Sequence, residues 1–408
     1  MSRTLHHVII GGSAAGVAAA FSMRASGFEG RITIVDAGTD EPYERPPLSK
    51  TFEDLGTPRP IVPSESYVDH GIDLVLGVRA TVLDEQRHRV RLDNGEDLFA
   101  DAVLLATGVS PRRLGIAGED LGNVLGLRDI HDARAMSDRL DAGGHLVIIG
   151  GGFIGLEAAA VARRRGLDVT VVEAMPMPLI GVLGTGLAAI IMQRMHTSEG
   201  VRILTGRTAM EFRGGPEVEE VLLDDGTRLE AATVLVGCGV APNDRLAREA
   251  GVHTDAGIVT DDHGRTSNRW IWAAGDVANY VSPYTGRRQR IEHWDVAQRH
   301  GTAVGANMAG LQVINTETPY FWSDQYGKRL QMYGRAEAGD RLVMRSTPSG
   351  DGFLAFWLRG DRLVASAGID QPKELRATKP LIENRVPVRA AQLADPAVSL
   401  RRLGRTRV

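Results

Sequence analysis

The segment HLVIIGGGFIG, residues 145–155, is the most informative stretch of this sequence. After His145, residues 146–149 form an apolar run typical of a buried strand, and Gly150, Gly152 and Gly155 have the GxGxxG spacing. The helix-forming segment LEAAAVARRR follows, and a second apolar run, residues 169–172, ends at Glu173. This order predicts a βαβ unit with a parallel strand pair. At such a loop the helix N-terminus and the glycines let a pyrophosphate approach the backbone.

Glu173 lies 18 residues after Gly155, where the second strand ends. A carboxylate at this place accepts hydrogen bonds from the free 2′-hydroxyl of NAD and repels a 2′-phosphate. The next residues, AMPMP, include no Arg or Lys that could hold a phosphate. We therefore predict NADH rather than NADPH, although a solvated strand end is the alternative interpretation of Glu173. The candidate contact residues from this unit are Gly150, Gly152, Ile154, Gly155 and Glu173.

The same pattern occurs near the N-terminus. A short apolar strand, residues 7–10, leads into the loop GGSAAG, residues 11–16, and then into an alanine-rich helix. A second strand, residues 31–35, ends at Asp36, which follows Gly16 by 20 residues and can accept hydrogen bonds from ribose hydroxyls. Ser13 replaces the usual second glycine, and its small side chain should affect phosphate approach only modestly. A tight turn without a ligand is the alternative interpretation.

The two copies lie about 140 residues apart with nothing similar between them, which favours two nucleotide-binding domains over a repeat array. The phrases VLLATG, residues 103–108, and VLVGCG, residues 234–239, are apolar strands that end in small residues, where a ligand could approach closely. From residue 316 onward the pattern changes to short strands at 341–345, 353–358 and 363–369, followed by a helix near 373–384. The fold class is therefore α/β, with two Rossmann-like domains and a small α+β C-terminal domain. The basic end, residues 401–408, is expected to fray.

Composition restricts the function classes. The chain has 408 residues and a net charge of −4, which does not indicate nucleic acid or an anionic membrane as a partner. Cys238 is the single cysteine, so an internal disulfide or a CxxC pair is excluded, as in a cytoplasmic protein. No apolar run approaches ~18 residues, and the N-terminus lacks a signal peptide pattern. We expect a soluble cytoplasmic protein without a metal site.

Five motifs occur in a fixed order: PYERPPLSK (42–50), GGGFIGLE (150–157), IWAAGDVA (271–278), RIEHWDVA (290–297) and FWSDQY (321–326). Together they resemble the NADH-dependent ferredoxin reductases of oxygenase systems, from residue 6 to about 388. The resemblance implies a fold like that of glutathione reductase. The implied domains are an FAD domain, 1–110 plus 240–315, an inserted NAD domain, 111–239, and a C-terminal domain, 316–408.

The resemblance also implies residue roles. Lys50 would lie near the reactive nitrogen of the flavin, and Glu157 would approach the nicotinamide and pair with Lys50. Asp276 would hold the ribitol chain, and Trp294 and Trp322 would lie near the isoalloxazine. The candidate FAD residues are Gly11, Gly12, Ser13, Ala14, Ala15, Gly16, Asp36, Arg45, Lys50, Ala80, Ala106, Thr107, Gly108, Arg128, Gly275, Asp276, Trp294 and Trp322.

Alternatives accompany these roles. Lys50 could instead be a solvated loop lysine, and Glu157 could stabilise its helix N-terminus. Trp294 and Trp322 could be packing anchors for the C-terminal domain, alongside flavin contact or in place of it. His293 and His300 are more simply surface or core histidines than catalysts. The family's usual ribose acid comes one place later, at Ala37, so Asp36 is expected to take that role.

The implied reaction transfers a hydride from NADH to FAD and then single electrons to a small ferredoxin that serves an oxygenase. Lys50 would stabilise negative charge on the reduced flavin. The protein is expected to be a monomer or a weak homodimer. Acidic ferredoxins would dock on cations near the tryptophans, although ordinary solvated charges explain the same residues. These cations are Arg287, Arg288, Arg290, Lys328 and Arg329.

Two other functions share this domain order. Disulfide reductases, peroxidases and NADH oxidases need a redox cysteine in the first domain, whereas Cys238 lies in the later apolar strand VLVGCGV and is expected to be buried packing. An NADH-sensing flavoprotein resembling apoptosis-inducing factor would act through partner or nucleic-acid binding. The lack of a concentrated basic patch disfavours nucleic acid, and slow turnover with every ferredoxin would favour the sensor.

Overall fold

The computed structural model describes residues 4–52, 55–316, 318–346 and 352–404. The chain forms two compact units, each assembled from separated segments. The first contains Met1–Arg45, Gly56–Ser110 and Val240–Glu317, and the second contains Pro46–Leu55, Pro111–Gly239 and Thr318–Val408. The domain boundaries expected from the sequence stay a prediction.

A five-stranded parallel sheet forms the centre of the first unit, in the order β19-β7-β1-β2-β3. Its strands are β1 His6–Ile10, β2 Arg31–Asp36, β3 Ile72–Leu76, β7 Ala102–Leu105 and β19 Ile271–Ala273. The helices of this unit are α1 Ala14–Ala25, α2 Ser64–Asp69, α6 Arg245–Glu249 and α7 Trp294–Met308. Alternate strand residues point to opposite faces, so the buried runs of β1, β2 and β7 supply two apolar cores, one on each face of the sheet.

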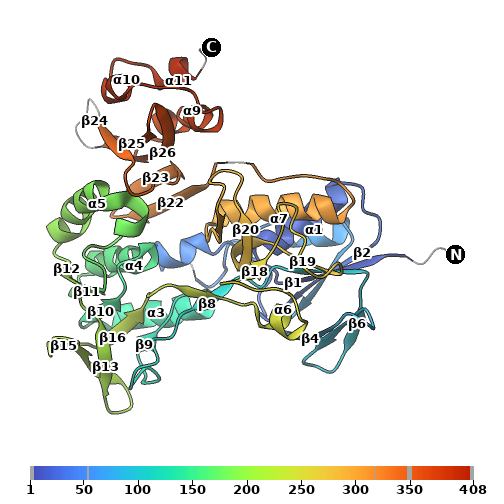
Figure 1. Cartoon of the computed structure of the whole chain (residues 1–408). Helices are drawn as coiled ribbons and strands as arrows, with labels where there is room; N and C mark the ends of the chain where they lie inside the picture. The colour runs from blue at the N-terminus through green and yellow to red at the C-terminus, as the bar shows by residue number, and fades with distance from the viewer. Residues whose placement is uncertain (1–3, 53–54, 317, 347–351, 405–408) are drawn as a thin grey trace. The chain divides into compact units, whose positions relative to one another are not determined.

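Helices α1 and α7 pack closely against each other on this sheet (Figure 1). A Cβ atom on Gly301 would lie 2.2 Å from the carbonyl oxygen of Ala15, and one on Gly305 would lie 2.3 Å from that of Ala19. Ser22 Oγ also donates to the carbonyl oxygen of Thr302 at 2.6 Å. The small residues of both helices therefore allow this approach, and α7 was not expected from the sequence.

Smaller antiparallel or mixed sheets complete the first unit. They contain β4 Ala80–Asp84, β5 Arg89–Leu92 and β6 Asp97–Phe99, then β18 Ile258–Val259, β20 Ala278–Val281 and β21 Arg288–Gln289, and the pair β8 Val109–Pro111 and β17 Val240–Pro242.

A second parallel sheet, in the order β12-β11-β10-β16-β9, lies in the second unit. Its strands are β9 Val124–Leu125, β10 Leu146–Ile149, β11 Val169–Glu173, β12 Arg202–Thr205 and β16 Thr233–Val236. Its helices are α3 Ile130–Ala142, α4 Phe153–Arg164 and α5 Ile180–Ile191, and α5 continues into a π-helical turn, Met192–His196. A three-stranded antiparallel sheet packs on the core of this parallel sheet. It contains β13 Ala209–Gly214, β14 Val218–Leu223 and β15 Arg228–Glu230.

The C-terminal part of the second unit is an antiparallel sheet in the order β22-β23-β26-β25-β24. Its strands are β22 Tyr320–Gln325, β23 Lys328–Gly334, β24 Arg341–Ser346, β25 Phe353–Arg359 and β26 Arg362–Ile369. Four short helices accompany this sheet, α8 Pro372–Arg376, α9 Lys379–Glu383, α10 Ala390–Ala394 and α11 Leu400–Leu403.

The predicted fold class is confirmed, because both βαβ units and the α+β C-terminal part are present. Two details differ from the sequence expectations. The single helix expected near 373–384 is split into α8 and α9, because Pro380 removes a backbone donor and restricts the residue before it. Part of the end expected to fray, Arg401–Leu403, is helical, whereas residues 405–408 lie outside the described residues.

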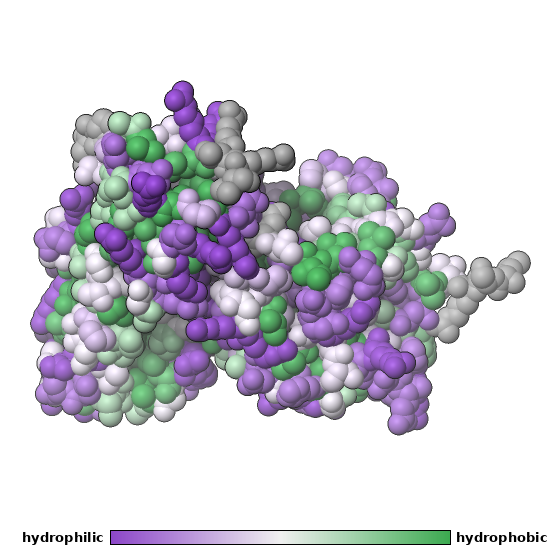
Figure 2. Space-filling view, turned by 45° about the horizontal axis from the view of Figure 1, so that its top comes forward, coloured by the Kyte–Doolittle hydropathy of each residue, from purple (hydrophilic) through white to green (hydrophobic). Residues whose placement is uncertain are grey.

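Within the described residues, no helix combines the length and the apolar character that a membrane span requires. Figure 2 shows strongly hydrophilic residues spread over the visible face, with smaller apolar areas between them.

Candidate nucleotide sites and the Lys50–Glu157 cluster

The first glycine loop connects β1 to α1. Gly11 has φ +113°, and a Cβ there would lie 2.2 Å from the carbonyl oxygen of Ala106. Gly16 allows α1 to lie on the strand, since its Cβ would be 1.9 Å from the carbonyl oxygen of Gly11. Asp36 at the end of β2 accepts from the N–H groups of Gly12 at 2.5 Å and Gly38 at 2.7 Å. The acid expected from the sequence therefore lies beside the loop.

The second loop repeats this geometry between β10 and α4. Gly150 has φ +106°, and its Cβ would lie 2.5 Å from the carbonyl oxygen of Gly237. Glu173 accepts from the N–H groups of Gly151 at 2.8 Å and Met175 at 2.7 Å. Corresponding acids thus fix the two loops in the same way.

Both loops fit the pyrophosphate of a dinucleotide. Among the described contacts, no side chain caps the N-terminus of α1 at Ser13 or that of α4 at Gly152, so the first helical N–H groups stay available to an anion. A Cβ on Gly152 would meet its nearest protein atom only at 4.0 Å. The protein's own packing therefore does not require glycine there, as expected where a phosphate approaches. At the equivalent place in the first unit, Ser13 has extended φ −114° and fits without distortion.

Lys50 belongs to a short segment, Pro46–Leu55, that packs within the second unit. A 3₁₀ turn, Pro46–Ser49, precedes it. Arginines and a serine of α3 and the end of α4 hold the carbonyl groups of this segment. Arg165 Nη2 and Ser137 Oγ both donate to the carbonyl oxygen of Phe52 at 3.1 Å. Further along, Arg134 Nε donates to that of Leu55 at 2.9 Å.

Glu157 is the buried centre of a polar cluster in this unit. Its carboxylate is 4% exposed and accepts from Lys50 Nζ at 2.5 Å. Ser323 Oγ donates to the same oxygen at 2.6 Å, and Ser49 Oγ donates to the other oxygen. Lys50 Nζ also lies 5.9 Å from the centre of the Trp322 ring, within cation–π range. The structure therefore joins the predicted pair, and Lys50 is not a solvated loop lysine.

The sequence interpretation missed the two serines in this cluster, although both lie inside the quoted motifs. A usable signal was present in FWSDQY, because Phe321, Ser323 and Gln325 alternate on the buried face of β22. Polar residues at such positions indicate a bonded interior site.

Two family models and several known reductases match this chain. Residues 5–301 match the family model described as pyridine nucleotide-disulphide oxidoreductase, and residues 320–404 match that described as reductase C-terminal. The ferredoxin reductase component of chlorobenzene dioxygenase from Cupriavidus sp. (strain PS12) is 37% identical, with 98% of each chain covered. Putidaredoxin reductase of Pseudomonas putida is 36% identical, over 97% of this chain and 96% of that one.

Solved structures of reductases also match this chain. The putidaredoxin reductase of a covalent complex with putidaredoxin superposes with a TM-score of 0.92 at 36% identity, covering 98% of this chain and 97% of that one. A ferredoxin reductase of the CYP199A2 system from Rhodopseudomonas palustris gives 0.94 at 31% identity, covering 98% and 99%. The chain belongs to the ferredoxin reductase family of oxygenase systems. It is therefore an oxidoreductase, and it uses FAD and NAD(H).

Other candidate FAD residues of this reductase occupy ordered positions in the first unit. Thr107 and Gly108 follow β7 and are tied to Asn243. The Asn243 amide Nδ2 donates to the carbonyl oxygen of Thr107 at 2.9 Å, and its backbone N–H donates to that of Gly108 at 3.0 Å. The neighbouring Ala106 and the more distant Ala80 are buried.

The turn that carries Asp276 is held from α7. Gly275 has φ +77°, and its N–H donates to His300 Nδ1 at 3.2 Å. His300 is buried, which lowers its pKa to about 4 and keeps the ring neutral as an acceptor. Arg290 Nη1 donates to the carbonyl oxygen of Asp276 at 3.1 Å. His300 is therefore a core histidine that orders a candidate cofactor turn.

Three further candidate FAD residues, Trp294, Arg128 and Arg45, lie far from one another in the sequence. Trp294 begins α7 and packs partly against the core of the first unit that contains α1. Its role as a packing anchor for the C-terminal domain stays a prediction. The backbone N–H of Arg128 donates to Asp132 at 2.7 Å just before α3. Arg45 ends a segment of the first unit.

Cys238 differs from its sequence interpretation. It follows β16 in the loop rather than lying within the strand, and it is half-buried instead of fully buried. Its Sγ lies 3.6 Å from the carbonyl oxygen of Arg112, and desolvation raises the pKa of its thiol. A thiol with a raised pKa is a poor nucleophile.

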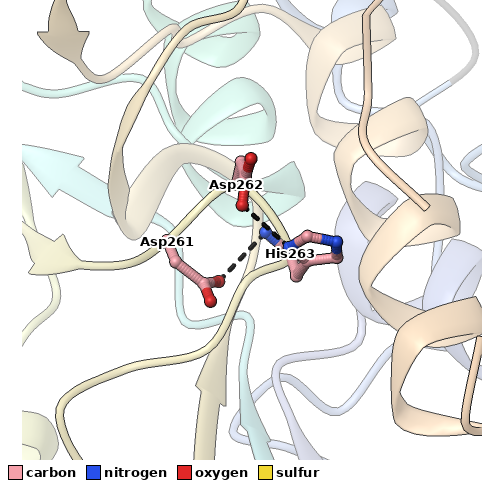
Figure 3. Close-up of side chains that lie close together, drawn as sticks. All are labelled: Asp261, Asp262 and His263. Carbon is pink, nitrogen blue, oxygen red and sulfur yellow. Dashed lines mark hydrogen bonds and ion pairs between the residues drawn. The ribbon is translucent and has the colours of Figure 1, made fainter. Parts of the chain in front are cut away.

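Asp261, Asp262 and His263 form a compact acidic group in one loop of the first unit (Figure 3). Asp261 accepts from the N–H groups of His263 at 3.0 Å and Arg265 at 2.8 Å, and Asp262 contacts His263 Nδ1 at 2.8 Å. These bonds close a turn, which accounts for the group without an ion.

Proposed function

We propose that this protein is an FAD-dependent NADH:ferredoxin reductase that supplies electrons to an oxygenase through a small iron–sulfur ferredoxin. The Lys50–Glu157 pair carries this proposal, because a largely buried ammonium is held by a buried carboxylate within the unit that contains the NAD-type loop. The relatives that are named for ferredoxins and oxygenases support the choice of partner.

The loop of the first unit would hold FAD, and the loop of the second would hold NADH. The first would use Gly11–Gly16, Asp36, Arg45, Ala80, Ala106, Thr107, Gly108, Gly275, Asp276 and Trp294. Lys50, Arg128 and Trp322, which belong to the second unit, stay candidates for FAD contact on the family resemblance. The second would use Gly150, Gly152, Ile154, Gly155, Glu157 and Glu173. The equal placement of Asp36 and Glu173 beside their loops supports two ribose-binding acids.

Lys50 and Glu157 would act as a unit. With FAD bound, the ammonium of Lys50 would stabilise negative charge on the flavin, and its fixed position would avoid reorganisation. Glu157 orients Lys50 and the nicotinamide, while Ser49 and Ser323 neutralise the cost of burying its carboxylate. A bound flavin supplies the change from a two-electron donor to single electrons for the ferredoxin. We place the enzyme in the cytoplasm, as a monomer or weak homodimer.

Stopped-flow kinetics test this function. The purified protein should carry one FAD per chain and reduce a [2Fe–2S] ferredoxin with NADH. Lys50→Met and Glu157→Gln should each slow flavin reduction by NADH on the order of 10²-fold, the effect of losing one preorganised electrostatic contact. Lys373→Met, at an exposed position in α8, is the matched control and should leave the rate unchanged.

Two results would contradict the proposal. Full-speed flavin reduction in both variants would remove the roles of Lys50 and Glu157. Very slow turnover with every ferredoxin, despite fast flavin reduction, would favour an NADH-sensing flavoprotein.

A further inference from the structure

A continuous series of hydrogen bonds, buried except at its outer end, leads away from Glu157 through the C-terminal sheet. Gln325 Nε2 donates to Ser323 Oγ at 2.9 Å, and Ser323 Oγ donates to Glu157 at 2.6 Å. At the other end, His196 Nε2 meets Gln325 Oε1 at 2.7 Å, and Tyr326 Oη meets His196 Nδ1 at 3.4 Å. The chain spans β22, the turn after it and the π-helical turn at the end of α5.

Chemistry gives every bond in this chain one direction. The Gln325 carbonyl oxygen can only accept, so His196 Nε2 carries the proton. Burial lowers the pKa of His196 to about 4, so its ring is neutral and Nδ1 accepts from the Tyr326 hydroxyl. Each group therefore donates toward the Glu157 carboxylate, and donors aligned in series polarise one another.

These residues occupy positions that packing alone would fill with apolar side chains. His196 and Ser323 have no exposed surface, and Gln325 is 3% exposed. Burying such groups is unfavourable unless each one is bonded, and here each one is. The carboxylate of Glu157 is the charged end of the series, and Lys50 shares the oxygen that Ser323 contacts.

We propose that Ser323, Gln325 and His196 are positioning residues that fix the Glu157 carboxylate and, through it, the ammonium of Lys50. This deepens the proposed function and rests on the roles given there to Lys50 and Glu157. The effect of a substitution should decline with the number of bonds between it and Glu157, so Ser323 matters more than Gln325.

The test uses the FAD-loaded enzyme and two readouts. The first is the acylation rate of Lys50 by sulfo-N-hydroxysuccinimide acetate, followed by peptide mass spectrometry. The other lysines of the chain, Lys328, Lys373 and Lys379, serve as internal references. The second readout is the limiting rate of flavin reduction by NADH and the NADH concentration that gives half of it.

Ser323→Ala should raise the relative acylation of Lys50 and lower the limiting rate by about 2- to 10-fold each, the range of one hydrogen bond. Gln325→Met, of similar volume, should change the acylation of Lys50 and the limiting rate in the same directions but to a smaller extent. The NADH concentration that gives half of the limiting rate should not change in either variant. Ser366→Ala is the matched control. Ser366 is equally buried in the same sheet and shares a hydrogen bond of 2.6 Å with Thr378, which is not part of the hydrogen-bond series to Glu157. Both readouts should therefore stay at the wild-type value.

A double-mutant cycle separates positioning from a merely structural role. In a Glu157→Gln background, Ser323→Ala should slow flavin reduction no further, because its effect passes through the carboxylate. Unchanged Lys50 acylation and flavin reduction in Ser323→Ala and Gln325→Met would overturn the inference while leaving the proposed function intact. Additive losses in the cycle, or equal losses in Ser366→Ala, would also overturn it. Wild-type rates in Lys50→Met and Glu157→Gln would instead contradict the proposed function.

Discussion

At the scale of single residues, two carboxylates perform the same local task. Asp36 and Glu173 each end the second strand of a βαβ unit and accept from the N–H group of the second loop residue. Each also accepts from the N–H two residues further along the chain. These backbone hydrogen bonds therefore hold each carboxylate beside its loop. A ribose hydroxyl bound there would donate to the same carboxylate oxygens.

Replacing Glu173 with Ala should narrow the preference for NADH over NADPH. The native enzyme should prefer NADH at least tenfold in kcat/KM, about 1.4 kcal/mol, because the carboxylate repels a 2′-phosphate. Steady-state kinetics with both cofactors measure the ratio. Asp36→Ala is the matched control: it should weaken FAD retention but keep the NADH preference of the molecules that hold flavin. Equal use of both cofactors by the native enzyme would refute the assignment of Glu173.

At the scale of elements, the contact between α1 and α7 determines how the first glycine loop is supported. The backbone of α1 approaches Gly301 and Gly305 too closely for any Cβ atom. The same helix α7 presents His300 to the Gly275 turn. One helix thus supports two candidate cofactor segments.

Gly301→Ala should lower the free energy of unfolding by about 1–3 kcal/mol, the usual cost of overpacking a core. Its Cβ would lie 2.2 Å from a backbone oxygen of α1, so the helices must separate, and FAD should dissociate more easily. Thermal melting and flavin release on dilution provide the measurements. Gly181→Ala in α5, where a Cβ meets nothing within 4 Å, should be neutral or slightly stabilising. An unchanged melting temperature in Gly301→Ala would show that the helices do not pack as described.

At the scale of the whole molecule, buried histidines determine part of the response to acid. Burial lowers the pKa values of His7, His196 and His300 to about 4, below the value of about 6.5 in an unfolded chain. Between these values the unfolded chain binds protons that the folded protein does not. The stability is therefore full above pH ~6.5 and is lost progressively as the pH falls toward 4.

His7→Phe should reduce this loss, because it removes one titrating group while keeping the ring stack on Phe28, whose centroid lies 4.1 Å away. The difference between urea unfolding midpoints at about pH 7 and about pH 5 should be smaller in the variant than in the native protein. A difference of the same size in both proteins would mean that His7 is not protonated on unfolding.

Docking of a ferredoxin is also a property of the whole molecule. Arg288 Nη1 donates to the carbonyl oxygens of Thr260 and Asn279, and Arg329 pairs with Asp324 at 2.6 Å, so both have local structural roles. We use Arg287, which is exposed, and Lys328 as probes of electrostatic docking, because their replacement keeps these bonds of Arg288 and Arg329.

Ferredoxin-dependent turnover should fall steeply as salt rises, because the Debye length shrinks to about 10 Å at about 0.1 M. NADH-to-ferricyanide turnover should change little. Arg287→Glu or Lys328→Glu should raise the apparent KM for ferredoxin and leave flavin reduction by NADH unaltered. Insensitivity to both salt and these reversals would place docking on another or a mainly apolar surface.

The two βαβ units can be predicted from the sequence, because their signals are local. Strand, glycine loop, helix and terminal acid lie within about 30 residues, and the backbone requires small residues at Gly11 and Gly150. Which distant side chains meet depends on tertiary packing, and only the family resemblance indicated the Lys50–Glu157 pair in advance. Glu157 lies 107 residues from Lys50 and 166 from Ser323, and nothing in the spacing predicts these contacts. They exist because the Pro46–Leu55 segment and β22 pack against α4, where a buried carboxylate must find donors.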